Sequence, residues 1–279
     1  MAGKLVLVGT PIGNLEDASP RALRILAEAD LVACEDTRRT RKLLGHYGVR
    51  AKELVVYNDV NERREVGVLM QRLLRGSTVA LVSDAGMPGL SDPGFRLVAA
   101  CAEASVPVEV VPGPNAAVSA LAVSGLAPGR FAFEGFLPRK PGPRQRRVEE
   151  LALERRTLVL YESPHRVEAT LAALLEGLGD RRAVLARELT KLHEEVRRGS
   201  LSTLLESARE RPPKGEIVVV VEGAVHDARP AVDPSELAAR ARALMDEGRP
   251  RAAAMSEVAR EAGVPRKRVF EALLEDPGG

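Results

Sequence analysis

The sequence predicts an α/β protein made of two α/β domains and a small all-α C-terminal segment. Short runs rich in β-branched residues alternate with amphipathic stretches as far as residue 225, which is typical of βαβ units and a parallel sheet. The remainder of the chain carries no strand signal. The composition, with 45% hydrophobic and 29% charged residues over 279 positions, is that of a globular chain long enough for two domains.

Five strand-like runs predict the sheet of the first domain, over residues 1–113. Each run is followed by a turn, and most turns lead into a helical pattern. Ser19 and Pro20 supply an N-cap and a first helical residue, whereas Gly48 and Gly76 stand where helices are expected to stop. The runs are KLVLVGT (4–10), DLVACED (30–36), ELVVYN (53–58), TVALVSD (78–84) and VPVEVVP (106–112).

The pattern changes after residue 113, and we place the second α/β domain over residues 114–225. It opens with NAAVSALAVSG (115–125), a predicted helix of small residues that can pack closely against a neighbouring element. Further helical stretches, such as residues 165–179, separate its strands. These strands are FAFEGF (131–136), TLVLYES (157–163), RAVLAREL (182–189) and GEIVVVVEG (215–223).

The C-terminal segment, residues 230–279, follows the linker-like VHDARPAVDP (225–234). Residues 252–274 have the pattern of a helix, a glycine-containing turn and a basic helix, which is that of a helix-turn-helix motif. A plain helical hairpin packed on the body of the protein is the alternative interpretation.

Composition and spacing exclude several classes of protein. No apolar run is long enough for a signal sequence or a membrane span, so we expect a cytoplasmic protein without membrane contact. No cluster of histidine, cysteine and carboxylate residues has zinc spacing, so no metal is expected. Cys34 and Cys101 are expected to be buried structural thiols, with a catalytic role for Cys34, at a strand end, as the alternative.

Two basic stretches are candidate phosphate contacts, although the net charge of +2 shows no overall design for nucleic acid. PRKPGPRQRR (138–147) contains no acid and is expected to be a flexible loop. TRRTRK (37–42) lies at an expected helix start, where a solvated helix face explains it equally well.

Three loops rich in glycine and proline follow predicted strands: residues 8–14, 83–94 and 111–117. Loops at the carboxyl ends of parallel strands meet at one crevice, so they predict a shared cleft in which the backbone contacts the ligand. The longest, SDAGMPGLSDPG, fits neither G-x-x-x-x-G-K-[ST] nor G-x-G-x-x-G, and its lack of lysine argues against a triphosphate ligand.

Polar residues near later strand ends are candidates for chemistry. His165, in YESPHR, is either a base or nucleic-acid contact or a structural hydrogen-bonding residue. Glu188 and Lys191, in RELTKLHEE, are either a general base and the group that orients it or an ion pair.

Eight stretches taken together resemble the bacterial small-subunit ribosomal RNA 2′-O-methyltransferases of the tetrapyrrole methylase superfamily. The resemblance runs in order and with family spacing from residue 4 to residue 224, and more loosely beyond. These stretches are LVGTPIGNLEDASPRAL, ACEDTRRTRKLL, ALVSDAGMPGLSDPG, VPGPNAAVSALAVSGL, FEGFLPRK, YESPHR, LARELTKLHEE and KGEIVVVVEG.

The resemblance implies a tetrapyrrole methylase fold whose cofactor, S-adenosyl-L-methionine, binds in the cleft between the two α/β domains. In this sequence S-D-A-G replaces the usual G-D-P loop, which favours backbone contacts over a contact from the Asp84 side chain. A neutral pocket rich in backbone groups would suit a zwitterionic amino acid joined to adenosine. The implied cofactor residues are Ile12, Gly13, Ser83, Asp84, Ala85, Gly86, Asn115, Ala116, Glu162 and Leu189.

The resemblance also implies methylation of the ribose of a decoding-centre cytidine in 16S rRNA, within the small ribosomal subunit, by a homodimer. Because a ribose hydroxyl is a poor nucleophile, a base should assist the in-line displacement. The candidates for it are Glu188, Lys191 and His165, followed by Glu35 and Asp36. The expected RNA contacts are Arg38, Lys140, Arg144, Arg146, Arg147, Arg266, Lys267 and Arg268.

Two other functions stay open from the residues alone. One is a methyltransferase of the same superfamily that acts on a tetrapyrrole or on a modified protein side chain. The other is a non-enzymatic regulator in which the α/β body senses a ligand and the tail binds nucleic acid.

Overall fold

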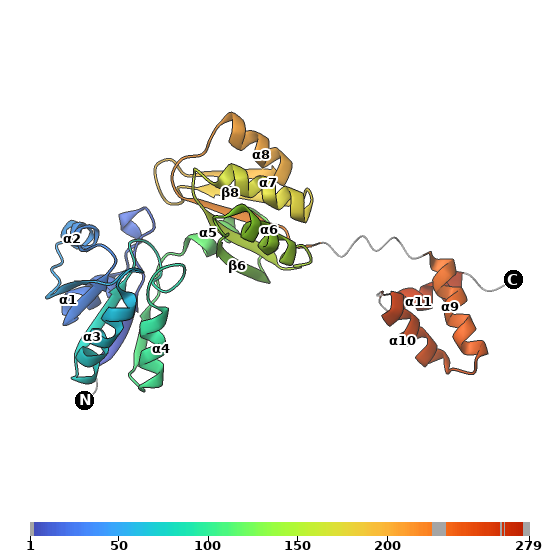
Figure 1. Ribbon diagram of the computed structural model, residues 1–279, viewed down its shortest axis with the longest axis horizontal. Coiled ribbons are helices and arrows are strands. Elements are labelled where there is room, and N and C mark those ends of the chain that lie inside the picture. Colours follow the sequence, from blue (N-terminus) through green and yellow to red (C-terminus); the bar gives the residue numbers. More distant parts are fainter. Residues whose placement is uncertain (1–2, 225–232, 263, 265, 276–279) are drawn as a thin grey trace. The chain divides into compact units, whose positions relative to one another are not determined.

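The computed structural model describes residues 3–224, 233–262, 264 and 266–275. The chain forms two compact units, residues 1–224 and 225–279, and each is described here by itself (Figure 1). The first unit contains both α/β domains. The elements of the second unit are all helices within its described part, so the predicted fold class is confirmed.

The first domain is built on a five-stranded parallel sheet with the order β3-β2-β4-β1-β5. Each predicted run contains one strand, and alternate residues face opposite sides. Leu5 belongs to one core and the adjacent Val6 to the other. The strands are β1 (Lys4–Val8), β2 (Leu31–Cys34), β3 (Leu54–Val56), β4 (Thr78–Val82) and β5 (Val108–Val111).

Helices cover both faces of this sheet. α1 (Pro20–Glu28) and α2 (Thr37–His46) share one core with the sheet, and α3 (Glu62–Leu74) and α4 (Phe95–Glu103) share the other. Ser19 caps α1 as predicted, since its hydroxyl accepts a hydrogen bond from the Ala22 amide at 3.1 Å. Cys34 and Cys101 are both buried free thiols.

The sheet of the second domain differs from the first because it is mixed. Its order is β6-β7-β10-β8-β9, and only β6 and β7 run parallel. The unpredicted strand β9 lies at the edge and reads EVRRGS, without the apolar run that marks a buried strand. The strands are β6 (Phe131–Phe136), β7 (Thr157–Glu162), β8 (Arg182–Arg187), β9 (Glu195–Ser200) and β10 (Ile217–Val221).

Three helices pack on one face of the second sheet: α6 (Pro141–Glu150), α7 (Val167–Leu178) and α8 (Leu201–Glu210). α5 (Ala116–Ser124) packs on the other face, together with Ile12 from the first domain. The prediction of a flexible loop over residues 138–147 is wrong, because the greater part of this basic stretch forms α6. A proline in the first turn of a helix loses no hydrogen bond, so Pro141 can begin one.

The second unit contains α9 (Pro234–Asp246), α10 (Arg251–Ala262) and α11 (Arg266–Glu275). Its own apolar core includes Leu237 from α9 and Val269 from α11. α10 and α11 occupy the predicted helix-turn-helix stretch. The predicted linker lies mostly outside the described residues. No helix in the described ranges is long and apolar enough to cross a membrane.

Candidate functional site

The loops after β1 and β4 are joined directly at the carboxyl edge of the first sheet. The Thr10 amide donates to the Gly86 carbonyl at 2.9 Å, and the Gly86 amide donates to the Thr10 carbonyl at 3.1 Å. The Thr10 hydroxyl also donates to the Ser83 carbonyl at 3.2 Å. Gly86 has a φ of +85°, which glycine adopts without strain. The two predicted loops therefore form one rigid backbone cradle.

The loop after β5 closes against the loop after β1 through two glycines. An added Cβ atom at Gly9 would lie 2.6 Å from the Gly113 Cα atom, and one at Gly113 would lie 2.7 Å from the Gly9 Cα atom. Only glycines permit this approach of the two backbones. The close approach brings the third predicted loop to the same edge as the other two.

A fourth loop reaches this edge from the second domain. The Thr190 hydroxyl accepts a hydrogen bond from the Asn14 amide at 3.0 Å. Glu188 and Thr190 have φ values of +52° and +67°, a left-handed conformation that is rare outside glycine. The segment around Thr190 thus holds the first loop of the cradle against the second domain.

These loops surround a cavity of about 260 Å³, which we call the donor cavity after the methyl donor that the resemblance implies. Most of the residues expected to bind the cofactor line it. The exceptions are Gly13 and Ser83, which line an adjoining cavity. The expected residues that line the donor cavity are Ile12, Asp84, Ala85, Gly86, Asn115, Ala116, Glu162 and Leu189.

The donor cavity is acidic, so the expectation of a neutral pocket is wrong. Arg39 is its one cationic lining residue among the described residues, and its Nη1 atom lies 3.0 Å from the Asp84 Oδ2 atom. Five carboxylate residues also line the cavity, namely Glu35, Asp84, Asp92, Glu162 and Glu216. Asp84 and Asp92 lie in the loop after β4, whereas Glu35, Glu162 and Glu216 come from three other segments of the chain, so the sequences of the glycine loops do not reveal the number of carboxylates at the cavity.

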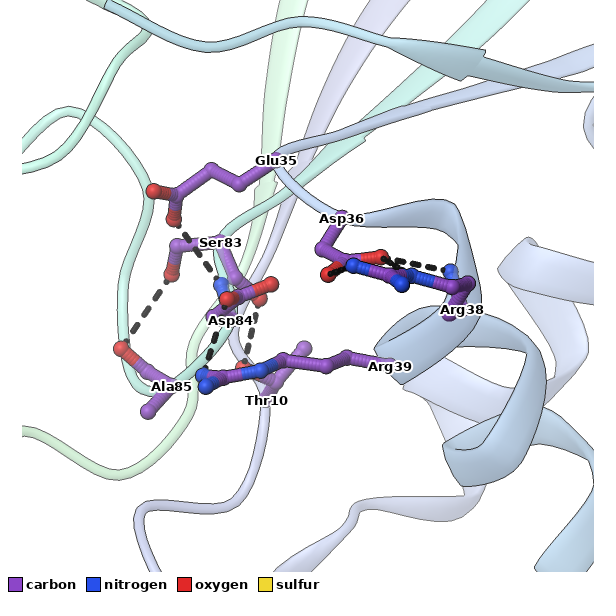
Figure 2. A network of polar contacts seen from close by, with 8 residues as sticks. All are labelled: Thr10, Glu35, Asp36, Arg38, Arg39, Ser83, Asp84 and Ala85. Carbon is purple, nitrogen blue, oxygen red and sulfur yellow. Dashed lines mark hydrogen bonds and ion pairs between the residues drawn. The ribbon is translucent and has the colours of Figure 1, made fainter.

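Two of these carboxylates have raised pKa values. Burial raises the pKa of Glu35, and the charges of Asp84 and Asp59 raise it further, although its Oε1 atom accepts a hydrogen bond from the Asp84 amide at 2.9 Å (Figure 2). Burial is also the main cause that raises the pKa of Asp92 to about 7, followed by the charge of Glu35. Asp92 can therefore exchange a proton near neutral pH.

The candidate bases from the sequence are dispersed around the site. Glu188 lies outside the donor cavity and accepts hydrogen bonds from Lys191 Nζ and from the Glu216 amide, both at 2.9 Å. The Lys191 ammonium is the main cause that lowers the pKa of Glu188. His165 is exposed in the turn before α7 and lines neither cavity. Asp36 caps α2, since it accepts from the Arg38 amide at 2.8 Å.

The expected RNA contacts also differ in their availability. In α6, Arg147 is held 2.6 Å from both Glu134 and Glu150, and Arg144 is half-buried. Arg146 and Lys140 are exposed.

The remaining expected contacts lie in two other helices. Arg38 is paired with Asp36 in the first unit at 3.2 Å. In the second unit Arg266 is exposed, Arg268 lies 3.8 Å from Glu271, and the Lys267 side chain falls outside the described part.

Sequence reasoning missed several residues of the donor cavity. Asp92 stood inside a loop singled out for its glycines, and its acidity was the available signal. Tyr161 and Phe136 form an aromatic wall, with their ring centroids 5.7 Å apart. The two residues meet only because β6 pairs with β7, and this pairing is not visible in the sequence. No group of residues suited to holding a metal ion exists within the described ranges.

Comparison with known proteins identifies related sequences. The chain matches the model of the tetrapyrrole (corrin/porphyrin) methylases over residues 4–205. A protein named ribosomal RNA small subunit methyltransferase I from Synechocystis sp. is 46% identical over 274 residues, which cover 98% of both chains. A protein of the same name from Thermotoga maritima is 48% identical over 221 residues, covering 79% of this chain and 99% of that one.

Solved structures share the fold. Uroporphyrin-III-C-methyltransferase from Thermus thermophilus is 27% identical, with a TM-score of 0.56 over 78% of this chain and 94% of that chain. A structure named uroporphyrin-III C-methyl transferase from Thermus thermophilus, complexed with S-adenosyl homocysteine, has a TM-score of 0.56 at 23% identity, over 79% and 97% of the two chains.

Proposed function

The chain belongs to the tetrapyrrole (corrin/porphyrin) methylase family, and from this premise we propose that it methylates the ribose 2′-oxygen of a cytidine in the decoding centre of 16S rRNA. It is an enzyme, an rRNA methyltransferase that uses S-adenosylmethionine. To this activity the proposal adds three details: the modified nucleotide, the oxygen atom that receives the methyl group, and the assembled small subunit as the substrate. The observation that carries the site assignment is the acidic donor cavity at the meeting point of four loops.

The donor cavity suits S-adenosylmethionine in charge and in shape. The donor carries a sulfonium and an ammonium group. The carboxylates of Glu35 and Asp92, which form no ion pair within the described residues, can complement them, whereas Asp84, Glu162 and Glu216 are paired with Arg39, Arg166 and Lys191. Tyr161 and Phe136 supply an apolar surface for adenine, and the cradle around Gly86 presents backbone groups to polar atoms of the donor. The absence of a lysine from the glycine loops fits a ligand without phosphate.

Two carboxylates are suited to accept the proton that the ribose hydroxyl loses. Glu35 and Asp92 line the donor cavity, and a base with a pKa near neutrality is efficient in proton transfer. We assign this role to Asp92, with Glu35 keeping its pKa high. Glu188 and Lys191 then act as positioning residues, because their ion pair fixes the loop that carries Thr190.

The substrate is tested by methyl transfer from labelled S-adenosylmethionine. We expect label in 16S rRNA of isolated small subunits, recovered as 2′-O-methylcytidine after digestion to nucleosides. Free tetrapyrrole and duplex DNA serve as the competing acceptors. Label in the tetrapyrrole, or on a base of the RNA, would contradict the proposal.

Donor affinity should depend on pH through Asp92. With a pKa of about 7, this carboxyl is neutral at pH 6 and ionised at pH 8, and only the ionised form attracts the sulfonium. We expect the dissociation constant of S-adenosylmethionine to fall by up to about tenfold over this range. Calorimetric titration at four pH values would measure it.

Asp92→Asn should remove this pH dependence and slow methyl transfer. Asp59→Asn is the matched control, because Asp59 is an exposed acid beside the cluster that does not line the donor cavity. The control should retain the pH dependence, with a midpoint moved to lower pH because the Asp59 charge contributes to the raised pKa of Asp92. An unchanged profile in Asp92→Asn would remove Asp92 from the donor site.

The helical unit of residues 225–279 is proposed to dock RNA and not the donor. Every residue that lines the donor cavity precedes residue 225, and an alignment with 79% of this chain spans nearly all of the Thermotoga relative. A chain ending at Ala224 should therefore bind S-adenosylmethionine normally and methylate subunits less well. Calorimetry and the labelled-methyl assay measure the two properties.

Arg266 and Arg268 test the docking role without deleting the unit. Replacing both by alanine should lower the slope of log affinity for subunits against log salt concentration by about one to two. We also propose a homodimer, and light scattering on the shortened chain shows whether the helical unit supports it. Full activity of that chain on subunits would contradict RNA docking.

A further inference from the structure

A second cavity adjoins the donor cavity on the side of α2. Its volume is about 450 Å³, and it shares part of its wall with the donor cavity. The residues common to both are Ile12, Arg39, Asp84, Ala85 and Glu216. Two ligands, one in each cavity, would therefore be separated from each other by little more than the side chains of this common wall.

The second cavity has a basic side that the donor cavity lacks. Arg39, Lys42 and His46 line it from α2, where spacings of three and four residues place them on one face of the helix. Lys191 lines it from the second domain but is paired with Glu188 and Glu216 at 2.9 and 3.0 Å. The anion-binding capacity of this side therefore rests on α2.

Arg39 and Lys42 differ in their present partners. Arg39 is directed at Asp84 through its Nη1 atom, whereas the neighbouring Arg38 is directed at Asp36 (Figure 2). Lys42 is exposed and has no hydrogen bond or ion pair to any residue that the structure describes. Its ammonium group is thus available to an anion that enters the cavity.

We propose that this second cavity binds a backbone phosphate of the RNA next to the target nucleotide, with Lys42 as its principal contact and His46 and Arg39 beside it. The inference rests on the proposed function and specifies how its substrate is held. A ribose 2′-oxygen and the 3′-phosphate of the same nucleotide are attached to adjacent ring carbons. A hydroxyl presented to the donor therefore places a phosphate nearby, and the two adjoining cavities meet this requirement.

The carboxylate of the methyl donor is the other anion that Lys42 could bind. The two sources differ in what a substitution changes: loss of a phosphate contact weakens RNA binding alone, whereas loss of a carboxylate contact weakens donor binding. The RNA phosphate is favoured because Lys42 lines the second cavity and does not line the donor cavity.

The test uses the full chain with Lys42→Ala, Lys42→Arg and Arg41→Ala. Arg41 is a matched control, since it is an exposed cation on the same helix without a partner among the described residues, and it lines neither cavity. Binding of a single-stranded oligoribonucleotide is measured over a salt series. Lys42→Ala should lower the slope of log affinity against log salt by about 0.7, the value of one single-strand phosphate contact. Lys42→Arg and Arg41→Ala should keep the slope.

Calorimetry with S-adenosylmethionine completes the test, and its affinity should be equal in all variants. A slope unchanged in Lys42→Ala, or lowered equally in Arg41→Ala, would overturn the inference. Donor affinity lost with Lys42 would also overturn it, in favour of the donor carboxylate. The proposed function fails in a different way, namely if the unmodified protein binds the oligonucleotide with the full slope but leaves small subunits unlabelled.

Discussion

Gly113→Ala should abolish binding of S-adenosylmethionine. The added methyl group would lie 2.7 Å from the Gly9 Cα atom and 2.8 Å from the Gly9 carbonyl carbon, and backbone atoms cannot move aside as a flexible side chain can. The loops after β1 and β5 must then separate, which displaces both Ile12 and Asn115 from the donor cavity. Overpacking of this kind destabilises proteins by about 1–3 kcal/mol.

Gly45→Ala is the control for Gly113→Ala. Gly45 lies within α2, and an added Cβ atom there would meet nothing within 4 Å. Alanine in a helix is more stable than glycine by roughly 0.5–1 kcal/mol, so this variant should unfold at slightly higher denaturant and keep its donor affinity. Calorimetric titration and urea unfolding of both variants provide the measurements. Normal donor affinity in Gly113→Ala would show that the contact between the two loops is not needed for the site.

Glu162→Ala should be the most destabilising substitution of a charged residue in the donor cavity. The Glu162 side chain is 0% exposed and accepts hydrogen bonds from the Thr170 hydroxyl at 2.5 Å and the Ser163 amide at 2.8 Å. It also lies 3.5 Å from the guanidinium of Arg166. Removing one partner of a buried ion pair leaves the other charge uncompensated, and we expect a loss of about 3 kcal/mol in the free energy of unfolding.

Two further variants separate the charge of Glu162 from its hydrogen bonds. Glu162→Gln keeps hydrogen-bonding atoms near Thr170 and Ser163 and should lose less stability than the alanine variant. Combining Glu162→Gln with Arg166→Met removes both charges and should recover part of the loss, because neither charge is then left without its partner. Urea unfolding of the three variants measures these differences. Equal stability of Glu162→Ala and the unmodified protein would show that the pair contributes nothing to folding.

The sequence was sufficient to predict those elements whose signals are local. The strands of the first sheet are apolar runs of a few residues, and Ser19 with Pro20 marks a helix start by its own chemistry. β9 was missed because an edge strand of charged residues lacks such a run, although Glu195, Arg187 and Arg197 stabilise it through ion pairs. The basic stretch that begins α6 has the composition of a loop because proline disfavours helix interiors, but Pro141 stands in the first turn, where a helix tolerates it.

In the candidate site too, features with local sequence signals could be predicted, and features that depend on the fold could not. The three glycine loops were visible because turns require particular residues, and their meeting follows from the parallel sheet. The acidity of the donor cavity was not visible, since Glu35, Asp92 and Glu216 are far apart in the sequence and meet only through the order of the strands. The separation of Arg38 from Arg39 likewise depends on which side of α2 each occupies.

The acidic lining of the donor cavity also bears on turnover. Methyl transfer converts the sulfonium into a neutral thioether, so the donor loses one positive charge at the moment of reaction. Asp92, as the proposed base, takes up the ribose proton, and the other carboxylates of the donor cavity remain around the product. Attraction between cavity and ligand is therefore strongest for the unreacted donor and weaker for its product. We therefore expect the loss of charge in the reaction to favour release of the spent molecule and capture of a new donor.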